Sequence, residues 1–168
     1  MLKKNIVLIG MMAAGKTTIG YKLAKELKYD FFDIDSEIEK SENEKIVNIF
    51  QNKGEEYFRK LEEKISLVFL DKNKSVISIG GGAFLNNKIR DKIKKNSYSF
   101  WLKWKIKTIL SRILKNNRRP LALKLKNKEI VNLYRNRIKF YKLSDFKVNC
   151  ENKSKNEIIK QISKIIKK

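Results

Sequence analysis

Residues 6–27 read IVLIGMMAAGKTTIGYKLAKEL, and this stretch decides which fold to expect. An apolar run ends at Gly10, and Gly15-Lys16-Thr17 then opens a segment whose apolar residues recur at helical spacing. The spacing G-x-x-x-x-G-K-T is that of the phosphate-binding loop, in which backbone N–H groups and a helix start surround a phosphate. Because a strand precedes the motif and a helix follows it, the sequence predicts a nucleoside triphosphate site. In that motif Lys16 reaches the phosphates and the Thr17 hydroxyl binds Mg²⁺.

The composition is typical of a folded protein. The chain has 168 residues, 42% hydrophobic and 35% charged, and we expect a single domain over residues 1–168. No apolar run could span a membrane and no signal-peptide pattern is present, so we expect a cytoplasmic protein. The lone cysteine, Cys150, cannot form an internal disulfide, and we expect a buried or incidental thiol. The chain has no histidine, which excludes histidine catalysis and histidine metal sites.

Positive charge is concentrated in the second half of the chain. The net charge is +22, and residues 85–168 carry 26 Lys and Arg against 5 Asp and Glu, whereas residues 1–84 carry 14 against 13. This asymmetry raises nucleic-acid binding as an alternative function. However, Phe100, Leu102 and Trp104 alternate as core residues of a strand do, not as an exposed stacking surface. We therefore expect solvated lysines and no nucleic-acid partner.

Short β-type runs alternate with segments of helical periodicity. This alternation predicts an α/β fold, a three-layer α/β/α sandwich around a five-stranded parallel sheet. The expected strands are Asn5–Ile9, Phe31–Asp33, Ser75–Ile79, Ser97–Leu102 and Phe146–Asn149. The expected helices are Lys16–Lys28, Ile46–Gln51, Glu55–Leu70, Lys88–Lys94, Ile106–Leu114, Lys128–Lys142 and Lys155–Ile166.

A basic, weakly periodic stretch surrounds the sole proline, Pro120. It reads NNRRPLALKLKNKE over residues 116–129, a composition typical of a surface loop. We expect a mobile lid at about residues 115–127 that covers the phosphates.

Two aspartates follow the second expected strand. Asp33 and Asp35 lie at its C-terminal end, where ligands of open α/β sheets bind. Residues two apart on a strand share a face, so both carboxylates could face one crevice. Alternatively, they are a solvated pair in which Asp35 caps the following helix.

Two further segments bear on what receives the phosphate. Arg59 and Glu62, in GEEYFRKLEE, lie three apart on one helix and can pair, either at a site or as a surface ion pair. The strand VISI ends in Gly80-Gly81-Gly82. Three successive glycines let a ligand approach the backbone closely, whereas a turn alone needs one or two.

Taken in order, these motifs resemble shikimate kinase: G-x-x-x-x-G-K-T, D-x-D, G-E-x-x-F-R-x-x-E, G-G-G-A and R-P-L. The match runs from about residue 5 to about residue 150. Members of that family transfer the γ-phosphoryl group of ATP to the 3-hydroxyl of shikimate, a step toward the aromatic amino acids. The resemblance implies a fold like that of nucleoside monophosphate kinases, ATP and shikimate as substrates, Mg²⁺ as cofactor and a monomer.

The resemblance also implies a nucleotide site. Arg112 would stack on adenine and Lys153 would line its other side, while Arg119 of the lid would close over the phosphates. Thr17 and Asp33 would hold Mg²⁺, the latter through water. The residues around the phosphates would be Ala13, Ala14, Gly15, Lys16, Thr17 and Thr18.

For the acceptor, the resemblance implies a carboxylate clamp made by Arg59 and Arg137. Asp35 would bind the ring hydroxyls and either orient or deprotonate the attacking one. Gly80, Gly81 and Gly82 would line the site, and the catalytic residues would be Lys16, Asp35 and Arg119. Guanidinium groups suit this task because they bind carboxylates in a bidentate manner.

The sequence departs from the family pattern at four places. Ala13 replaces a third loop glycine, with little expected effect, and Asn43 replaces a turn glycine, where Asn tolerates left-handed backbone. The lid reads R-P-L-A instead of R-P-L-L. The usual proline between Arg137 and Tyr141 is missing, which leaves Arg135 as a competing carboxylate ligand.

The phosphate loop is also compatible with other functions. Gluconate kinase and nucleotide kinases are the nearest enzymatic alternatives, but the D-x-D, F-R-x-x-E and triple-glycine set counts against both. An inactive kinase-like protein is another alternative. The retained motif residues count against an inactive protein, because the charged and hydroxyl side chains are all present, namely Lys16, Thr17, Asp33, Asp35, Arg59 and Arg119.

Overall fold

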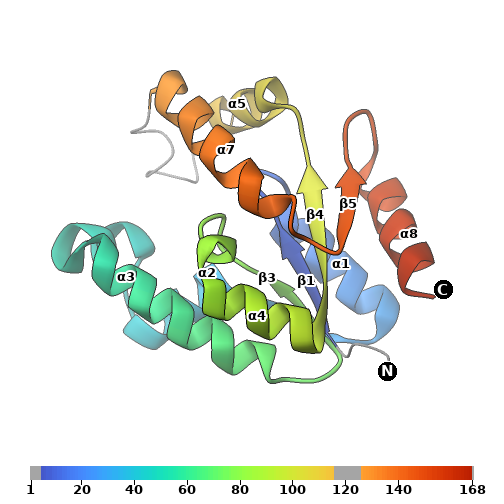
Figure 1. The fold of residues 1–168 in the computed structure, drawn as a ribbon, viewed down its shortest axis with the longest axis horizontal. Helices are drawn as coiled ribbons and strands as arrows, with labels where there is room; N and C mark the ends of the chain where they lie inside the picture. Colours follow the sequence, from blue (N-terminus) through green and yellow to red (C-terminus); the bar gives the residue numbers. More distant parts are fainter. Residues whose placement is uncertain (1–4, 116–125, 168) are drawn as a thin grey trace.

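The computed structural model describes residues 5–115 and 126–167. In this part of the chain five parallel strands form one sheet in the order β2-β3-β1-β4-β5 (Figure 1). All five agree with the predicted strands to within one residue at each end. The strands are β1 (Asn5–Ile9), β2 (Asp30–Asp33), β3 (Ser75–Ser78), β4 (Ser97–Lys103) and β5 (Phe146–Asn149).

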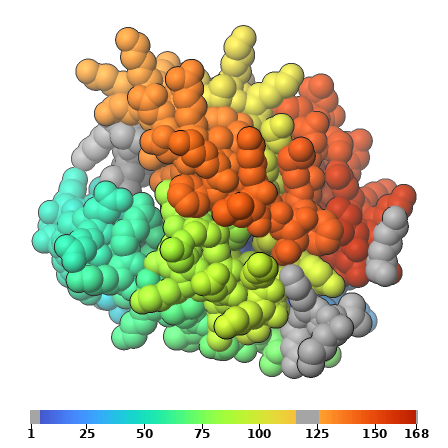
Figure 2. All heavy atoms as spheres, viewed as in Figure 1, coloured from blue at the N-terminus to red at the C-terminus, as the bar shows by residue number. Residues whose placement is uncertain are grey.

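Helices cover both faces of the sheet, so the predicted three-layer α/β/α arrangement is confirmed. On one face α1 packs beside α8, and on the other α4 packs beside α3. In Figure 2 the atoms of α7 lie directly against those of η1, the short turn Ala83–Leu85. The helices are α1 (Lys16–Leu27), α2 (Ile34–Glu42), α3 (Ile46–Leu70), α4 (Asn87–Asn96), α5 (Ile106–Leu114), α7 (Asn127–Tyr141) and α8 (Lys155–Ile166).

The helix after the D-x-D segment was anticipated only in passing and is absent from the expected helices. α2 starts at Ile34, so Asp33 occupies its N-cap position and Asp35 lies in its first turn. The expectation that Asp35 caps this helix is therefore wrong. The argument from a shared strand face is wrong too, because only Asp33 belongs to β2. Asp35 instead lies in the first turn of α2, near the positive end of the helix dipole.

The two helices predicted over residues 46–70 both form, and one glycine separates them within α3. Gly54 has φ 81° and ψ 172°, which interrupts the helical backbone between the predicted Ile46–Gln51 and Glu55–Leu70 segments. A left-handed φ of this kind favours glycine. Asn43, with φ 50°, likewise takes the left-handed conformation expected at its turn.

The aromatic residues of the basic half belong to the core, as predicted. Phe100, Leu102 and Trp104 are buried, and so is the intervening Trp101. β4 is thus buried on both faces, as strands of parallel sheets are. Cys150 is also fully buried. Among the described residues no helix is long and apolar enough to cross a membrane.

Candidate active site

The loop between β1 and α1 turns sharply through three positive-φ residues. Gly10 has φ 146°, Ala13 φ 60° and Gly15 φ 87°. Gly15 is the N-cap of α1 and has no side chain to cap the first turn, so the first backbone N–H groups of the helix are left to face a ligand. The loop therefore has the form of a phosphate site. Ala13 adopts a left-handed backbone, a conformation that is unfavourable for a residue with a side chain.

Lys16 crosses back over the loop. Its side chain is only 7% exposed, and its ammonium donates to the carbonyls of Gly10 at 2.9 Å and Met11 at 3.0 Å. These neutral acceptors are weaker partners than charged phosphate oxygens. A positive charge is thus held at the mouth of the loop, where the phosphates of a nucleotide would lie.

Two oxygen-bearing side chains meet beside this lysine. The Thr17 hydroxyl, at the start of α1, donates a 2.5 Å hydrogen bond to Asp33 Oδ2 at the end of β2. Hydroxyl and carboxylate oxygens are ligands that Mg²⁺ prefers, and this ion usually takes one or two carboxylates together with substrate phosphates. The described residues contain no group of three or more Asp, Glu, Cys or His side chains that could hold a metal ion. The pair therefore fits a phosphate-linked Mg²⁺ site and not an all-protein cage.

The glycine segment that follows β3 is packed against charged side chains. A side chain on Gly80 would collide with Glu62 and approach Asp35 Oδ1 to 3.0 Å, and one on Gly82 would approach Arg59 Nη1 to 2.6 Å. A larger residue at either position would force these charged groups to shift. Asp35 from α2 and Arg59 from α3 are thus brought to one place at the carboxyl end of the sheet.

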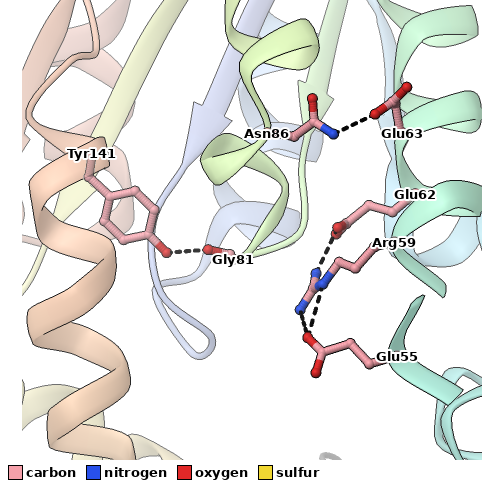
Figure 3. Close-up of polar contacts among 7 residues, drawn as sticks. All are labelled: Glu55, Arg59, Glu62, Glu63, Gly81, Asn86 and Tyr141. Carbon is pink, nitrogen blue, oxygen red and sulfur yellow. Dashed lines mark hydrogen bonds and ion pairs between the residues drawn. The ribbon is translucent and has the colours of Figure 1, made fainter. Parts of the chain in front are cut away.

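Arg59 is held by two glutamates from its own helix (Figure 3). Its Nη1 donates to Glu62 at 2.7 Å, while Nε and Nη2 donate to Glu55 at 3.2 and 3.1 Å. Glu62 is 3% exposed, and burial raises its pKa while Arg59 opposes that rise. The Glu55 side chain is 67% exposed. Glu62 is therefore the fixed partner of Arg59, and Glu55 is a partner that solvent or a ligand can replace.

Arg137 reaches the same segment from α7. It is 9% exposed, burial lowers its pKa, and its Nη1 would lie 2.9 Å from a side-chain carbon on Gly81. Its Nε is buried and has no hydrogen-bond partner among the described residues. Arg135 is exposed on the same helix. The geometry therefore favours Arg137 over Arg135 as a ligand for an anion in this site.

Tyr141 links Arg137 to the glycine segment. Its hydroxyl donates to the Gly81 carbonyl at 2.5 Å (Figure 3) and also interacts electrostatically with the Arg137 guanidinium. Tyr141 is fully buried, and burial raises its pKa to about 12, so it remains a donor at neutral pH. The sequence indicated only the spacing of Tyr141 from Arg137. Its contact with Gly81 was missed, because nothing local signals it.

On the other side of the phosphate loop lies Arg112 of α5. Its Cζ is 3.5 Å from the centre of the Trp104 ring, and its Nη1 is 3.4 Å from the Ala13 carbonyl. The Lys153 ammonium, from the turn after β5, donates to Gln161 of α8 at 2.7 Å. The structure thus places Arg112 beside the phosphate loop and turns the Lys153 ammonium toward α8. Trp104 was expected only as a core residue, and its contact with Arg112 was missed.

Two predicted features lie outside the described residues. These are Arg119 and most of the predicted lid at residues 115–127.

The chain is similar to known proteins over nearly its whole length. A family model described as shikimate kinase matches residues 12–167. The chain belongs to the shikimate kinase family. It is 41% identical over 159 residues to a shikimate kinase of Persephonella marina, with 95% of this chain and 96% of that protein covered.

Solved structures of shikimate kinases have the same fold as this chain. The chain superposes on the enzyme from Acinetobacter baumannii in complex with shikimate with a TM-score of 0.90 at 28% identity, covering 97% of this chain and 92% of that one. For the enzyme from Aquifex aeolicus the TM-score is 0.86 at 36% identity, with 97% and 96% covered. The predicted family and the predicted phosphate-loop α/β fold are both confirmed.

Proposed function

We propose that this member of the shikimate kinase family transfers the γ-phosphoryl group of ATP to the 3-hydroxyl of shikimate, giving shikimate 3-phosphate and ADP. One observation carries the proposal. A side-chain carbon on Gly81 would lie 3.4 Å from the Gly10 carbonyl and 3.6 Å from the Met12 nitrogen. The acceptor segment therefore contacts the phosphate loop, so a molecule bound on it would adjoin the terminal phosphate. A relative crystallised in complex with shikimate supports the choice of acceptor.

On the donor side, the loop backbone would surround the phosphates and Lys16 would neutralise their charge. Arg112 would stack on adenine, with the turn that carries Lys153 on its other side. Glu151 supports this placement, because it accepts a 2.7 Å hydrogen bond from the Lys105 backbone and so joins that turn to the start of α5. The proposed loop residues are Ala13, Ala14, Gly15, Thr17 and Thr18.

Mg²⁺ is the proposed cofactor. Thr17 and Asp33 would hold it, since their oxygens already meet at 2.5 Å and fit a hard cation. When bound, Mg²⁺ neutralises charge that develops on the phosphate oxygens. The chain's own contribution is to keep the Asp33 carboxylate next to the first turn of α1.

On the acceptor side, Arg59 and Arg137 would bind the carboxylate of shikimate against the Gly80–Gly82 backbone. Both arginines can accept a further carboxylate. The substrate could replace the exposed Glu55 as a partner of Arg59, and Nε of Arg137 lacks a hydrogen-bond partner among the described residues. Asp35, beside Gly80, would accept a hydrogen bond from the attacking hydroxyl and orient or deprotonate it. Phosphoryl transfer needs chiefly this positioning and charge neutralisation.

The remaining assignments rest on the family alone. Arg119, in a lid at about residues 115–127, would close over the phosphates and exclude water. Residues 1–168 would act as one domain that works as a monomer.

The test is an ADP-release assay with Mg·ATP and, in turn, shikimate, gluconate and AMP. We expect turnover with shikimate only, and a loss of about 100-fold in kcat for Asp35→Asn. Glu37→Gln is the matched control, because it removes a carboxylate of the same helix that pairs with Lys40 at the surface. Turnover with another acceptor, or an unaffected Asp35→Asn, would overturn the assignment.

A further inference from the structure

Trp104 is fixed in place between β4 and α5 although it is neither a motif residue nor on the acceptor side. Its side chain is 6% exposed, and its indole N–H donates to the Ala14 carbonyl of the phosphate loop at 2.9 Å. Its own carbonyl accepts a 3.0 Å hydrogen bond from the Tyr134 hydroxyl of α7. With both the ring and the backbone anchored, the indole forms a rigid surface beside the loop.

Arg112 lies on that surface. A distance of 3.5 Å between Cζ and the ring centre requires the guanidinium to lie over the indole face, where a cation is attracted to the π-electrons. Its Nη1, 3.4 Å from the Ala13 carbonyl, keeps the same group at the edge of the loop. A long arginine side chain normally has many rotamers, and here one of them is selected before any ligand arrives.

We infer that Trp104 is a positioning residue of the nucleotide site. It covers one face of the Arg112 guanidinium and leaves the opposite face for the purine base of ATP. The indole N–H also ties this stacking surface to Ala14, so the base and the phosphates are bound at a set distance from each other. The inference rests on the proposed function only in that the donor is a purine nucleotide.

Kinetics separate this role from simple packing. We expect Trp104→Leu to raise KM for Mg·ATP about tenfold, with kcat and the KM for shikimate within about twofold, because one cation–π contact is lost. Trp104→Phe keeps an aromatic face and should recover most of the affinity. The matched control is Trp101→Leu, because Trp101 is a tryptophan on β4 that is also buried. This variant should lower Tm without changing KM for Mg·ATP.

A double mutant tests whether Trp104 acts through Arg112. Trp104→Leu combined with Arg112→Ala should be no worse for KM of Mg·ATP than Arg112→Ala alone, since residues that act as a unit are not additive. Additive losses would overturn the inference. So would a Trp104→Leu protein with unchanged KM for Mg·ATP, or equal losses for both substrates.

Fluorescence gives a second measurement that needs no turnover and no stable leucine variant. Trp101→Phe leaves Trp104 as the sole tryptophan of the chain. Titrating that protein with Mg·ADP, without shikimate, should change its emission saturably, and adding Arg112→Ala should weaken the apparent affinity about tenfold. Emission that stays constant while calorimetry reports saturation with Mg·ADP would overturn the inference. Because shikimate is absent, this result is independent of whether shikimate is the acceptor.

Discussion

The hydroxyl of Tyr141 donates a 2.5 Å hydrogen bond to the carbonyl of Gly81 and so joins the end of α7 to the glycine segment after β3. The same hydroxyl interacts electrostatically with the guanidinium of Arg137, one helical turn earlier. A single buried group therefore sets the distance between a proposed carboxylate ligand and the backbone on which the acceptor would lie.

Removing that hydroxyl should weaken acceptor binding selectively. Tyr141→Phe keeps the ring but loses the bond to Gly81, and we expect KM for shikimate to rise about three- to tenfold while KM for Mg·ATP stays unchanged. Steady-state kinetics with each substrate varied in turn measure this. Tyr57→Phe is the control, since its hydroxyl bonds only to Glu42 at the surface among the contacts described. An equal rise in both KM values would point to general loosening of the fold.

For shikimate binding, the planar shape of the Arg137 guanidinium should contribute more than its charge. Arg137→Lys keeps the charge but cannot bind a carboxylate in a bidentate manner, so KM for shikimate should rise about 10- to 100-fold. Arg135→Lys, an exposed change on the same helix, should have no measurable effect. The reverse pattern would make Arg135 the carboxylate ligand.

Glu55 should compete with the acceptor for Arg59. Its carboxylate bonds to Nε and Nη2 of Arg59, where the carboxylate of shikimate would bind, and it is largely exposed. Because exposed ion pairs contribute at most about 1 kcal/mol, Glu55→Ala should lower KM for shikimate only about two- to threefold. Glu56→Ala, which removes an exposed partner of Lys60, is the control. A raised KM would mean that Glu55 positions Arg59 and does not compete.

The phosphate loop should be more stable with glycine at position 13. Ala13 has φ 60°, a conformation that strains a residue with a side chain. Ala13→Gly should raise the free energy of unfolding by up to about 1 kcal/mol, because relief of strain is partly offset by the more flexible unfolded chain. Urea denaturation measures this. A destabilised Ala13→Gly protein would show that the alanine methyl group contributes packing that outweighs the strain.

Alkaline pH should destabilise the fold through Cys150. Burial raises the pKa of its thiol from 9.0 to about 12, so the unfolded chain releases this proton at a lower pH than the folded one. The contribution of the thiol is therefore complete below pH 9 and is lost as the pH rises toward 12. We expect the free energy of unfolding of the wild type, relative to Cys150→Ala, to fall by about 1.4 kcal/mol per pH unit in that window. A difference that stays constant from pH 8 to pH 11 would contradict this.

Contiguous patterns in the sequence were sufficient for most of the helices and strands and for the phosphate loop. The apolar strand, Gly10 and Gly15-Lys16-Thr17 are neighbours in the chain, and their local backbone requirements define the loop wherever it occurs. The central strands β1 and β3 were found for the same reason, because their near-continuous apolar runs reflect burial on both faces. α2 was missing from the predicted helices, since only Ile34 and Ile38 of its nine residues are buried and two apolar positions show little periodicity.

The sequence by itself determined the family, the strands and the residues from which a kinase site can be built. Only the tertiary structure decided which of them meet: Tyr141 with Gly81, 60 residues apart, and Arg112 with Trp104. It also distinguished Arg137 from Arg135, since Arg137 is buried and Arg135 is exposed on the same helix. The physical reason is the strand order β2-β3-β1-β4-β5. That order is set by packing over the whole sheet, and it brings the ends of β3 and β4 to either side of β1, where distant segments acquire contacts that no local pattern encodes.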